Sequence, residues 1–252
     1  MNVKKTMVAG IAAICATATF ALESANIVGY QKIENRQGNT LQVATFNAVG
    51  GEGYNIQEII PVGDTVVGGG ETTIQTLTAA KATAKMFYWL TDDEWGTDNG
   101  ENGWFEDPNN TEEFADYTFD PGEGFIFASA NGSASVTYAG EVKYPVELAM
   151  TQGNSLCGNF WPKDMSLQQI VPAGATVVGG GETTIQTLTA AKATAKMFYW
   201  LTDDEWGTDN GENGWFEDPN NTEEFADYVF QPGEGYIFAS ANGPATLNFP
   251  EL

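Results

Sequence analysis

Histidine is absent from the 252-residue sequence, and cysteine occurs only at Cys15 and Cys157. The first absence excludes Ser-His-Asp and Cys-His catalytic machinery and removes the commonest zinc ligand. Cys15 lies in the segment predicted below to be cleaved, so the mature chain keeps one cysteine and has no internal disulfide. We expect Cys157 to be a buried small apolar residue, with an intermolecular disulfide as the alternative.

Basic residues are scarce: ten Lys and Arg stand against 34 Asp and Glu, a net charge of −24. Removal of residues 1–21 leaves eight basic residues against the same 34 acidic ones, a net charge of −26. A field of this sign repels phosphate backbones and anionic lipid surfaces. The composition therefore excludes nucleic acid as a partner and favours cations, basic partners or simple solubility.

Only one long apolar run is present, Thr6–Ala21, and it follows Lys4 and Lys5. A basic start, a short apolar run and small residues such as Ala21 and Ala25 are typical of a secretory signal peptide. The run is short for a membrane span, and no other follows. We predict cleavage after Ala21 or Ala25, export to the medium or the cell surface, and no membrane insertion.

The rest of the chain is an internal duplication. Thr65–Tyr117 and Thr176–Tyr228 are identical over 53 residues at an offset of 111, and Gln37–Leu41 resembles Gln152–Leu156 more weakly. A period of this length predicts two units, residues 26–139 and 140–252, each large enough to bury its own core. No Pro-, Ser- or Gly-rich spacer separates the units near Gly140, so we expect them to abut.

Within each unit the pattern indicates strands. Thr72–Thr78 alternates, Met86–Leu90 is continuously apolar and predicts a central strand covered on both faces, and Phe125–Phe127 and Ala134–Tyr138 predict two more. Pro121-Gly122 predicts a turn between strands. The predicted fold is all-β: two tandem small sandwich or barrel-like domains.

Three segments are less regular. Thr78–Lys85 contains good helix formers, but the flanking Thr and aromatic residues favour a turn at Ala79–Ala82 between two strands. Ile56–Ile60 suits one helical turn. Gly68-Gly69-Gly70 is interpreted as a flexible turn and not as a phosphate loop, because the following Glu71 would repel phosphate.

Short motifs resemble a known family. They are Ala25–Tyr30 after the signal, Gly103-Trp104, Asp120–Phe125 and Tyr138–Val142. In these motifs the chain resembles the secreted tandem β-repeat proteins of Verrucomicrobia, Lentisphaerae and Planctomycetes relatives. The resemblance covers nearly the whole mature chain and implies a bacterial, exported, β-rich protein, with no established activity or catalytic residues to carry over.

An acidic stretch, Lys85–Phe114, recurs unchanged as Lys196–Phe225. Its oxygen-bearing side chains are the hard ligands that calcium takes six to eight at a time. The spacing from Asp98 departs from the EF-hand pattern, because Gly100 and Asn109 fall where carboxylates are needed. No cofactor is otherwise indicated; calcium is the candidate, and a solvated acidic loop is the alternative. The candidate metal ligands are Asp92, Asp93, Asp98, Glu101 and Asn102, with Asp203, Asp204, Asp209, Glu212 and Asn213 in the second unit.

Aromatic residues lie among these acids, and aromatic faces beside Asp and Asn can stack on sugar rings. The candidate stacking residues are Trp95, Trp104, Phe105, Trp206, Trp215 and Phe216. The alternative is that these rings pack against the core, since tryptophan is usually substantially buried.

No carboxylate stands apart in an apolar setting that would raise its pKa, so the sequence does not predict an enzyme. Strand-like ends at Ala25–Tyr30 and Thr246–Phe249 could extend a neighbouring sheet and support self-association. The sequence thus predicts an exported structural or interaction module of the cell surface or extracellular matrix. A calcium-assisted, lectin-like protein that binds extracellular polysaccharide is the alternative.

Overall fold

The computed structural model describes residues 28–45, 53–64, 66, 68–77, 84–141, 147–177, 179–187 and 195–249. The predicted signal segment and the turn predicted at Ala79–Ala82 lie outside these residues. The described chain is nearly all β, which confirms the predicted fold class. None of its helices has the length and apolar character needed to cross a membrane.

Among its described residues, the first copy (28–141) has ten strands, one 3-10 turn and one short α-helix. In chain order these are β1 (Val28–Asn35), β2 (Gly38–Val43), β3 (Tyr54–Asn55), η1 (Ile56–Glu58), β4 (Pro61–Val62), β5 (Gly69–Gln75), β6 (Met86–Leu90), α2 (Asp92–Trp95), β7 (Gly103–Phe105), β8 (Thr118–Phe119), β9 (Gly124–Ser129) and β10 (Ala134–Glu141).

The second copy, residues 147–249, repeats this order. Its elements are β11 (Glu147–Met150), β12 (Gly153–Gly158), β13 (Met165–Ser166), η2 (Leu167–Gln169), β14 (Val171–Ala173), β15 (Gly180–Gln186), β16 (Met197–Leu201), α3 (Asp203–Trp206), β17 (Gly214–Phe216), β18 (Val229–Phe230), β19 (Gly235–Ser240) and β20 (Ala245–Asn248).

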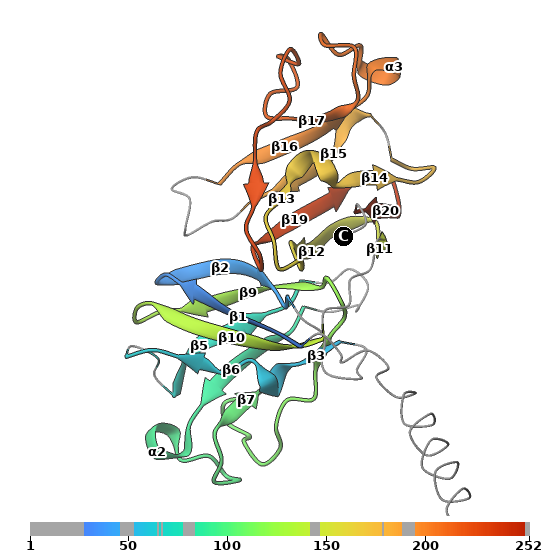
Figure 1. Cartoon of the computed structure of the whole chain (residues 1–252). Coiled ribbons are helices and arrows are strands. Elements are labelled where there is room, and N and C mark those ends of the chain that lie inside the picture. Colours follow the sequence, from blue (N-terminus) through green and yellow to red (C-terminus); the bar gives the residue numbers. More distant parts are fainter. Residues whose placement is uncertain are drawn as a thin grey trace, which may run out of the picture.

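Each copy builds the same sheets from antiparallel strands. A five-stranded sheet has the order β2-β9-β5-β6-β7 in the first copy and β12-β19-β15-β16-β17 in the second (Figure 1). A three-stranded sheet has the order β1-β10-β4 or β11-β20-β14, and a two-stranded ladder joins β3 to β8 or β13 to β18. β10 runs past the unit boundary predicted after residue 139, because Gly140 and Glu141 pair with Gly29 and Val28.

Alternation of side chains places one face of the five-stranded sheet in the core. Ile74 pairs with Phe87 on one side and Phe127 on the other, and all three side chains are fully buried. Such a row removes several large apolar side chains from water, at about 1.5–3 kcal/mol each. The opposite face is partly open, because Met86 is 42% exposed and Tyr88 is half-buried. The prediction that Met86–Leu90 is covered on both faces was therefore wrong at Met86 and Tyr88.

The three-stranded sheet closes the other side of this core. Val136 and Tyr138 of β10 are buried, and the Tyr138 ring meets Tyr54 edge-on at 5.5 Å between centroids. In the second copy, β20 is flanked on both sides by β11 and β14. The predicted strand at Thr246–Phe249 is therefore central over Thr246–Asn248 and offers no open edge to a neighbour. Among the strands that the structure describes, β1 pairs with β10 alone.

The irregular segments follow local chemistry. The helical turn predicted at Ile56–Ile60 is confirmed as η1, and the Asn55 side chain caps it by accepting the Gln57 N–H at 2.8 Å. The turn predicted at Pro121-Gly122 is also confirmed, with Gly122 at φ 80°. The prediction that Gly68-Gly69-Gly70 forms a flexible turn was wrong at Gly69 and Gly70, which are the first two residues of β5.

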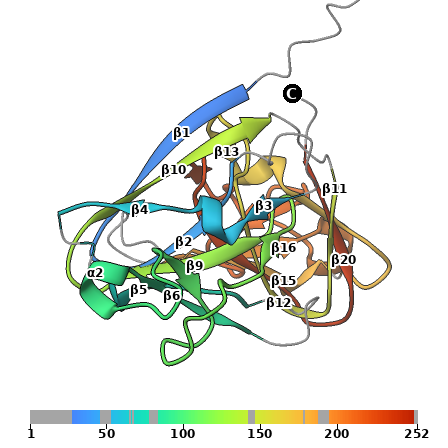
Figure 2. The ribbon, with the colours of Figure 1, turned by 90° about the horizontal axis from the view of Figure 1, so that it is seen from below.

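The two copies contact each other through equivalent strands. Gln42 of β2 bridges to Glu234, and Cys157 of β12 bridges to Glu123. Gln42 is equivalent to Cys157, because they pair with Phe125 and Tyr236 of equivalent strands, and Glu123 is equivalent to Glu234 at the repeat offset. The contact is therefore nearly two-fold symmetric, as in an isologous dimer. Viewed from below, the second copy lies behind the first (Figure 2).

Candidate functional site

The acidic loop of each copy begins with a one-turn helix. In the first copy, α2 ends at Trp95, and the following Gly96 adopts a left-handed conformation at φ 71° and donates its N–H to the Asp92 carbonyl at 2.8 Å. The Asn102 side chain accepts the Asp92 N–H at 2.8 Å. Asn213 does the same for Asp203 in α3. One of the predicted metal ligands, Asn102, thus holds the loop by its side-chain oxygen.

The Asp98 side chain joins two parts of the same loop by hydrogen bonds to Thr111. Its carboxylate accepts the Thr111 N–H at 3.2 Å and the Thr111 hydroxyl at 2.9 Å. The buried Thr97 hydroxyl donates to the Glu101 carbonyl at 2.9 Å. Asp209 and Thr222 repeat the first arrangement in the second copy. Charge-assisted bonds of this kind give the loop a defined shape.

The predicted calcium ligands lie on this loop, and all five in the first copy are exposed. Within the described residues, no group of three His, Cys, Asp or Glu side chains is arranged to hold a metal ion. The side chains of Asp98 and Asn102 already accept hydrogen bonds from backbone N–H groups of the loop. Calcium binding stays a prediction for both copies.

The six predicted stacking residues separate into two groups. Trp104 and Phe105 are fully buried, and so are Trp215 and Phe216. The Trp104 indole N–H donates to the Ile59 carbonyl at 2.6 Å, and its ring meets Trp89 at 5.5 Å. These rings belong to the core, as the alternative interpretation proposed, and present no face to a ligand.

Trp95 and Trp206 are the exposed members, at 45% and 46%. Each indole N–H is fixed by a backbone carbonyl: Trp95 donates to Pro108 at 2.9 Å and Trp206 to Pro219 at 2.8 Å. The hydrogen bond holds the ring while part of its face stays open to solvent. These two rings are the stacking surface that the structure leaves available.

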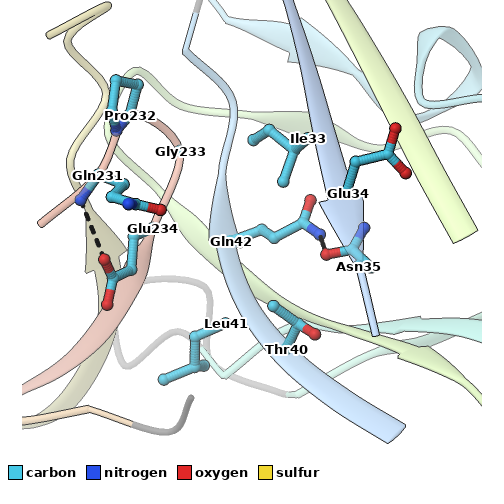
Figure 3. A pocket seen from close by; sticks show the side chains of 10 residues that line it. All are labelled: Ile33, Glu34, Asn35, Thr40, Leu41, Gln42, Gln231, Pro232, Gly233 and Glu234. Atoms are coloured by element: carbon cyan, nitrogen blue, oxygen red, sulfur yellow. Dashed lines mark hydrogen bonds between the residues drawn. The ribbon is translucent and has the colours of Figure 1, made fainter. Parts of the chain in front are cut away.

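A second candidate site lies where the copies meet. A pocket of about 90 Å³ is lined by residues 33–35 of β1, 40–42 of β2 and 231–234 before β19 (Figure 3). Gln31 ties its rim to the second copy by donating its side-chain N–H to the Pro232 carbonyl at 3.0 Å. Val43, next to the pocket, donates its N–H to the Gly233 carbonyl at 3.2 Å and packs in the core of the second copy.

A polar chain of three buried side chains ends at this pocket. The Tyr138 hydroxyl donates to Gln42 Oε1 at 2.8 Å, and Gln42 Nε2 donates to Asn35 Oδ1. All three side chains are at most 1% exposed. Burial raises the pKa of Tyr138, so its hydroxyl stays protonated and able to donate. Asn35 Nδ2 and the Thr40 hydroxyl have no hydrogen-bond partner among the described residues.

The equivalent positions of the second copy are apolar. Asn35 pairs with Ala134 as Met150 pairs with Ala245, and Gln42 is equivalent to Cys157. Tyr138 corresponds to Phe249 at the repeat offset. Burial raises the pKa of the Cys157 thiol to about 12, as expected for the predicted inert core cysteine. The two ends of the near-symmetric contact thus differ in chemistry.

This pocket was not predicted from the sequence. Its residues come from three separate segments, and the contact between copies had to be known before they could be grouped. A signal was nevertheless available, because alignment of the copies shows Asn, Gln and Tyr at positions 35, 42 and 138 where the other copy has Met, Cys and Phe. No family model, curated protein or solved structure matches the chain.

Proposed function

We propose that this protein is an exported, non-enzymatic structural or interaction module of the bacterial cell surface or extracellular matrix. The observation that supports this is the placement of the two acidic loops. The copies touch through β2, β9, β12 and β19, whereas α2 and α3 follow β6 and β16 towards the far edges of their sheets. The two identical loops therefore lie at opposite ends of the molecule (Figure 1).

Two identical binding surfaces at opposite ends of a molecule are better placed to bind two separate partners than to bind one partner together. Avidity on one partner requires that both sites reach it together, and opposite placement prevents this for a compact target. The proposed role is therefore to bridge: the same chemistry engages one neighbour at each end. The neighbours are further copies of this chain or an extracellular polymer.

Light scattering of the chain from Asn26 onwards tests self-association. Because both ends are acidic, we expect association to increase with protein concentration only when a divalent cation offsets the repulsion between ends. Sodium chloride at the same ionic strength is the control. A monodisperse monomer at every protein and calcium concentration would contradict self-association and leave a polymer as the bridged partner to be tested.

Carbohydrate contact is the second candidate function, and the half-exposed, hydrogen-bonded rings of Trp95 and Trp206 favour it. The test compares precipitation of soluble polysaccharides by the wild type, Trp95→Ala, Trp206→Ala and the double variant. Each single variant should still bind but fail to precipitate the polymer, since one end remains. Binding that survives in the double variant would show that the tryptophan rings are not the contact surface.

A further inference from the structure

Asparagine followed directly by glycine is a reactive pair, and it occurs six times in the sequence. Glycine has no Cβ, so its backbone nitrogen can approach the preceding side chain with little steric hindrance. Because all six pairs share this chemistry, their surroundings in the folded chain decide which of them reacts. The pairs begin at Asn99, Asn102, Asn131, Asn210, Asn213 and Asn242.

The pair that begins at Asn99, in the acidic loop, is held on both sides of the reacting groups. The Asn99 side-chain oxygen accepts the Glu101 N–H at 3.0 Å. The Gly100 N–H, which is the attacking group in the reaction, donates to the Thr97 carbonyl at 3.0 Å. The equivalent pair at Asn210 repeats both hydrogen bonds. Both bonds must break before the glycine nitrogen can reach the amide carbon.

The pair that begins at Asn102 is held by the sheet. The Asn102 side-chain oxygen accepts the Asp92 N–H at 2.8 Å. Gly103 is a buried residue of β7 and pairs with Leu90 of the neighbouring strand. The pair at Asn213 has the same arrangement in the second copy. All four pairs of the acidic loops are therefore fixed.

The two remaining pairs lie in the turns that follow β9 and β19, and their asparagine side chains are exposed. Within the part of the chain that the structure describes, the side chains of Asn131 and Asn242 make no hydrogen bond, and neither does the N–H of the glycine after each. The second turn is nevertheless tied, because the Ser240 hydroxyl donates to the Gly243 carbonyl at 2.6 Å. The equivalent Ser129 hydroxyl has no partner among the described residues. Asn131 is thus the least constrained of the six.

We propose that Asn131 is a site of spontaneous deamidation through a cyclic imide. The Gly132 backbone nitrogen attacks the side-chain carbonyl carbon of Asn131 and forms a new C–N bond. The side-chain nitrogen then leaves as ammonia and takes the proton of the Gly132 N–H with it. Water opens the ring at either of its two carbonyl groups and gives aspartate or isoaspartate. Water enters and ammonia leaves, so the step needs no enzyme, metal or oxidant.

Each event changes the turn between β9 and β10. It adds one negative charge to a chain whose net charge is already −24. Isoaspartate also places the Cβ carbon in the main chain. The Gln37 side chain donates to the carbonyl of the preceding residue, Ala130, at 2.6 Å, so this tie lies directly beside the modified position. The modification accumulates with the age of the molecule and does not depend on the function proposed for the acidic loops.

Incubation of the chain from Asn26 onwards at mildly alkaline pH, followed by tryptic digestion and mass spectrometry, tests the proposal. Residues 86–143 and 197–252 form separate tryptic peptides, so the equivalent asparagines of the two copies are distinguished. We expect Asn131 to deamidate at least about tenfold faster than the four loop asparagines, because those must first lose hydrogen bonds. Isoaspartate should exceed aspartate in the product, as a cyclic imide requires.

Three comparisons make the test specific. In urea the contacts of the loops and turns are lost, so all six pairs should react at similar rates. Asn131→Gln should remove the product at this position and leave the other five sites unchanged, because the longer side chain closes a ring less readily. Ser240→Ala frees the Gly243 carbonyl and should raise the rate at Asn242 towards that at Asn131.

The proposal is overturned if Asn131 stays unmodified in the folded chain, or if any loop asparagine reacts as fast as Asn131 there. Aspartate as the only product would contradict the cyclic imide. An unchanged rate at Asn242 in Ser240→Ala would contradict the explanation given for the difference between the two turns.

Discussion

Tryptophan residues of one loop have opposite environments, and neither environment follows from the residue type. Trp104 is fully buried and donates its indole N–H to the Ile59 carbonyl, whereas Trp95 is 45% exposed and donates to the Pro108 carbonyl. Both indole nitrogens are satisfied. The difference lies in how much apolar ring surface each removes from water, and this difference can be measured.

Trp104→Phe should lower the free energy of unfolding by about 2–4 kcal/mol, because it leaves a cavity and strands the buried Ile59 carbonyl. Trp95→Phe removes a bond of the same type at a half-exposed site and should cost less than about 1 kcal/mol. Urea unfolding followed by circular dichroism measures both. Equal costs for the two variants would contradict the burial that separates the core ring from the surface ring.

At the scale of elements, the copies approach so closely that two glycines are required. A Cβ on Gly124 would lie 2.8 Å from the Cys157 backbone nitrogen, and one on Gly235 would lie 2.7 Å from the Gln42 backbone nitrogen. These glycines are equivalent members of β9 and β19. Because the opposing atoms belong to backbone, no side chain can rotate away to make room.

Gly124→Ala and Gly235→Ala should each destabilise the protein by about 1–3 kcal/mol and loosen the contact between copies. Asn39→Ala, at an exposed position of β2, is the control and should change stability little. Thermal unfolding measures the cost, and limited proteolysis of the whole chain reports the loosened contact. If the double glycine variant melts and resists proteolysis as the wild type does, the close approach of β9 and β12 is wrong.

Strand positions could be predicted from the sequence where alternation was strong. Met86–Leu90 and Phe125–Phe127 were found because their aromatic residues mark buried rows, and η1 was found from its short apolar turn before Pro61. The edge strands β2 and β7 were not predicted, because Gly38–Val43 and Gly103–Phe105 are short and owe their conformation to pairing with β9 and β6.

The candidate sites were predictable only in part. The acidic loops were visible as composition, but the burial of Phe105 and Trp104 depends on β6 and η1, which are distant in sequence. The pocket beside Asn35 depends on contacts with residues 231–234, about two hundred positions away. Packing between distant segments, which no local pattern contains, determined both outcomes.

At the scale of the whole molecule, the charge is large and unevenly placed. Ten basic residues face 34 acidic ones, and the described salt bridges Lys85–Glu106 and Lys196–Glu217 lie on the exposed surface of each copy. Surface pairs of this kind contribute about 0–1 kcal/mol. Repulsion among the unpaired carboxylates therefore opposes folding, and it is strongest within each acidic loop at the ends of the molecule.

Added salt should consequently raise the melting temperature by screening this repulsion, with most of the gain reached once the Debye length falls to about 10 Å near 0.1 M. Calcium chloride and sodium chloride compared at equal ionic strength separate screening from binding, because a bound ion stabilises by mass action beyond its screening effect. Asp93→Asn with Asp204→Asn alters exposed carboxylates that accept no hydrogen bond from the part of the chain that the structure describes, and should abolish any excess due to calcium at the loops. Equal melting temperatures in the two salts would mean that the predicted calcium ligands act only as solvated charge, whereas an excess that persists in the double variant would place the ion elsewhere on the molecule.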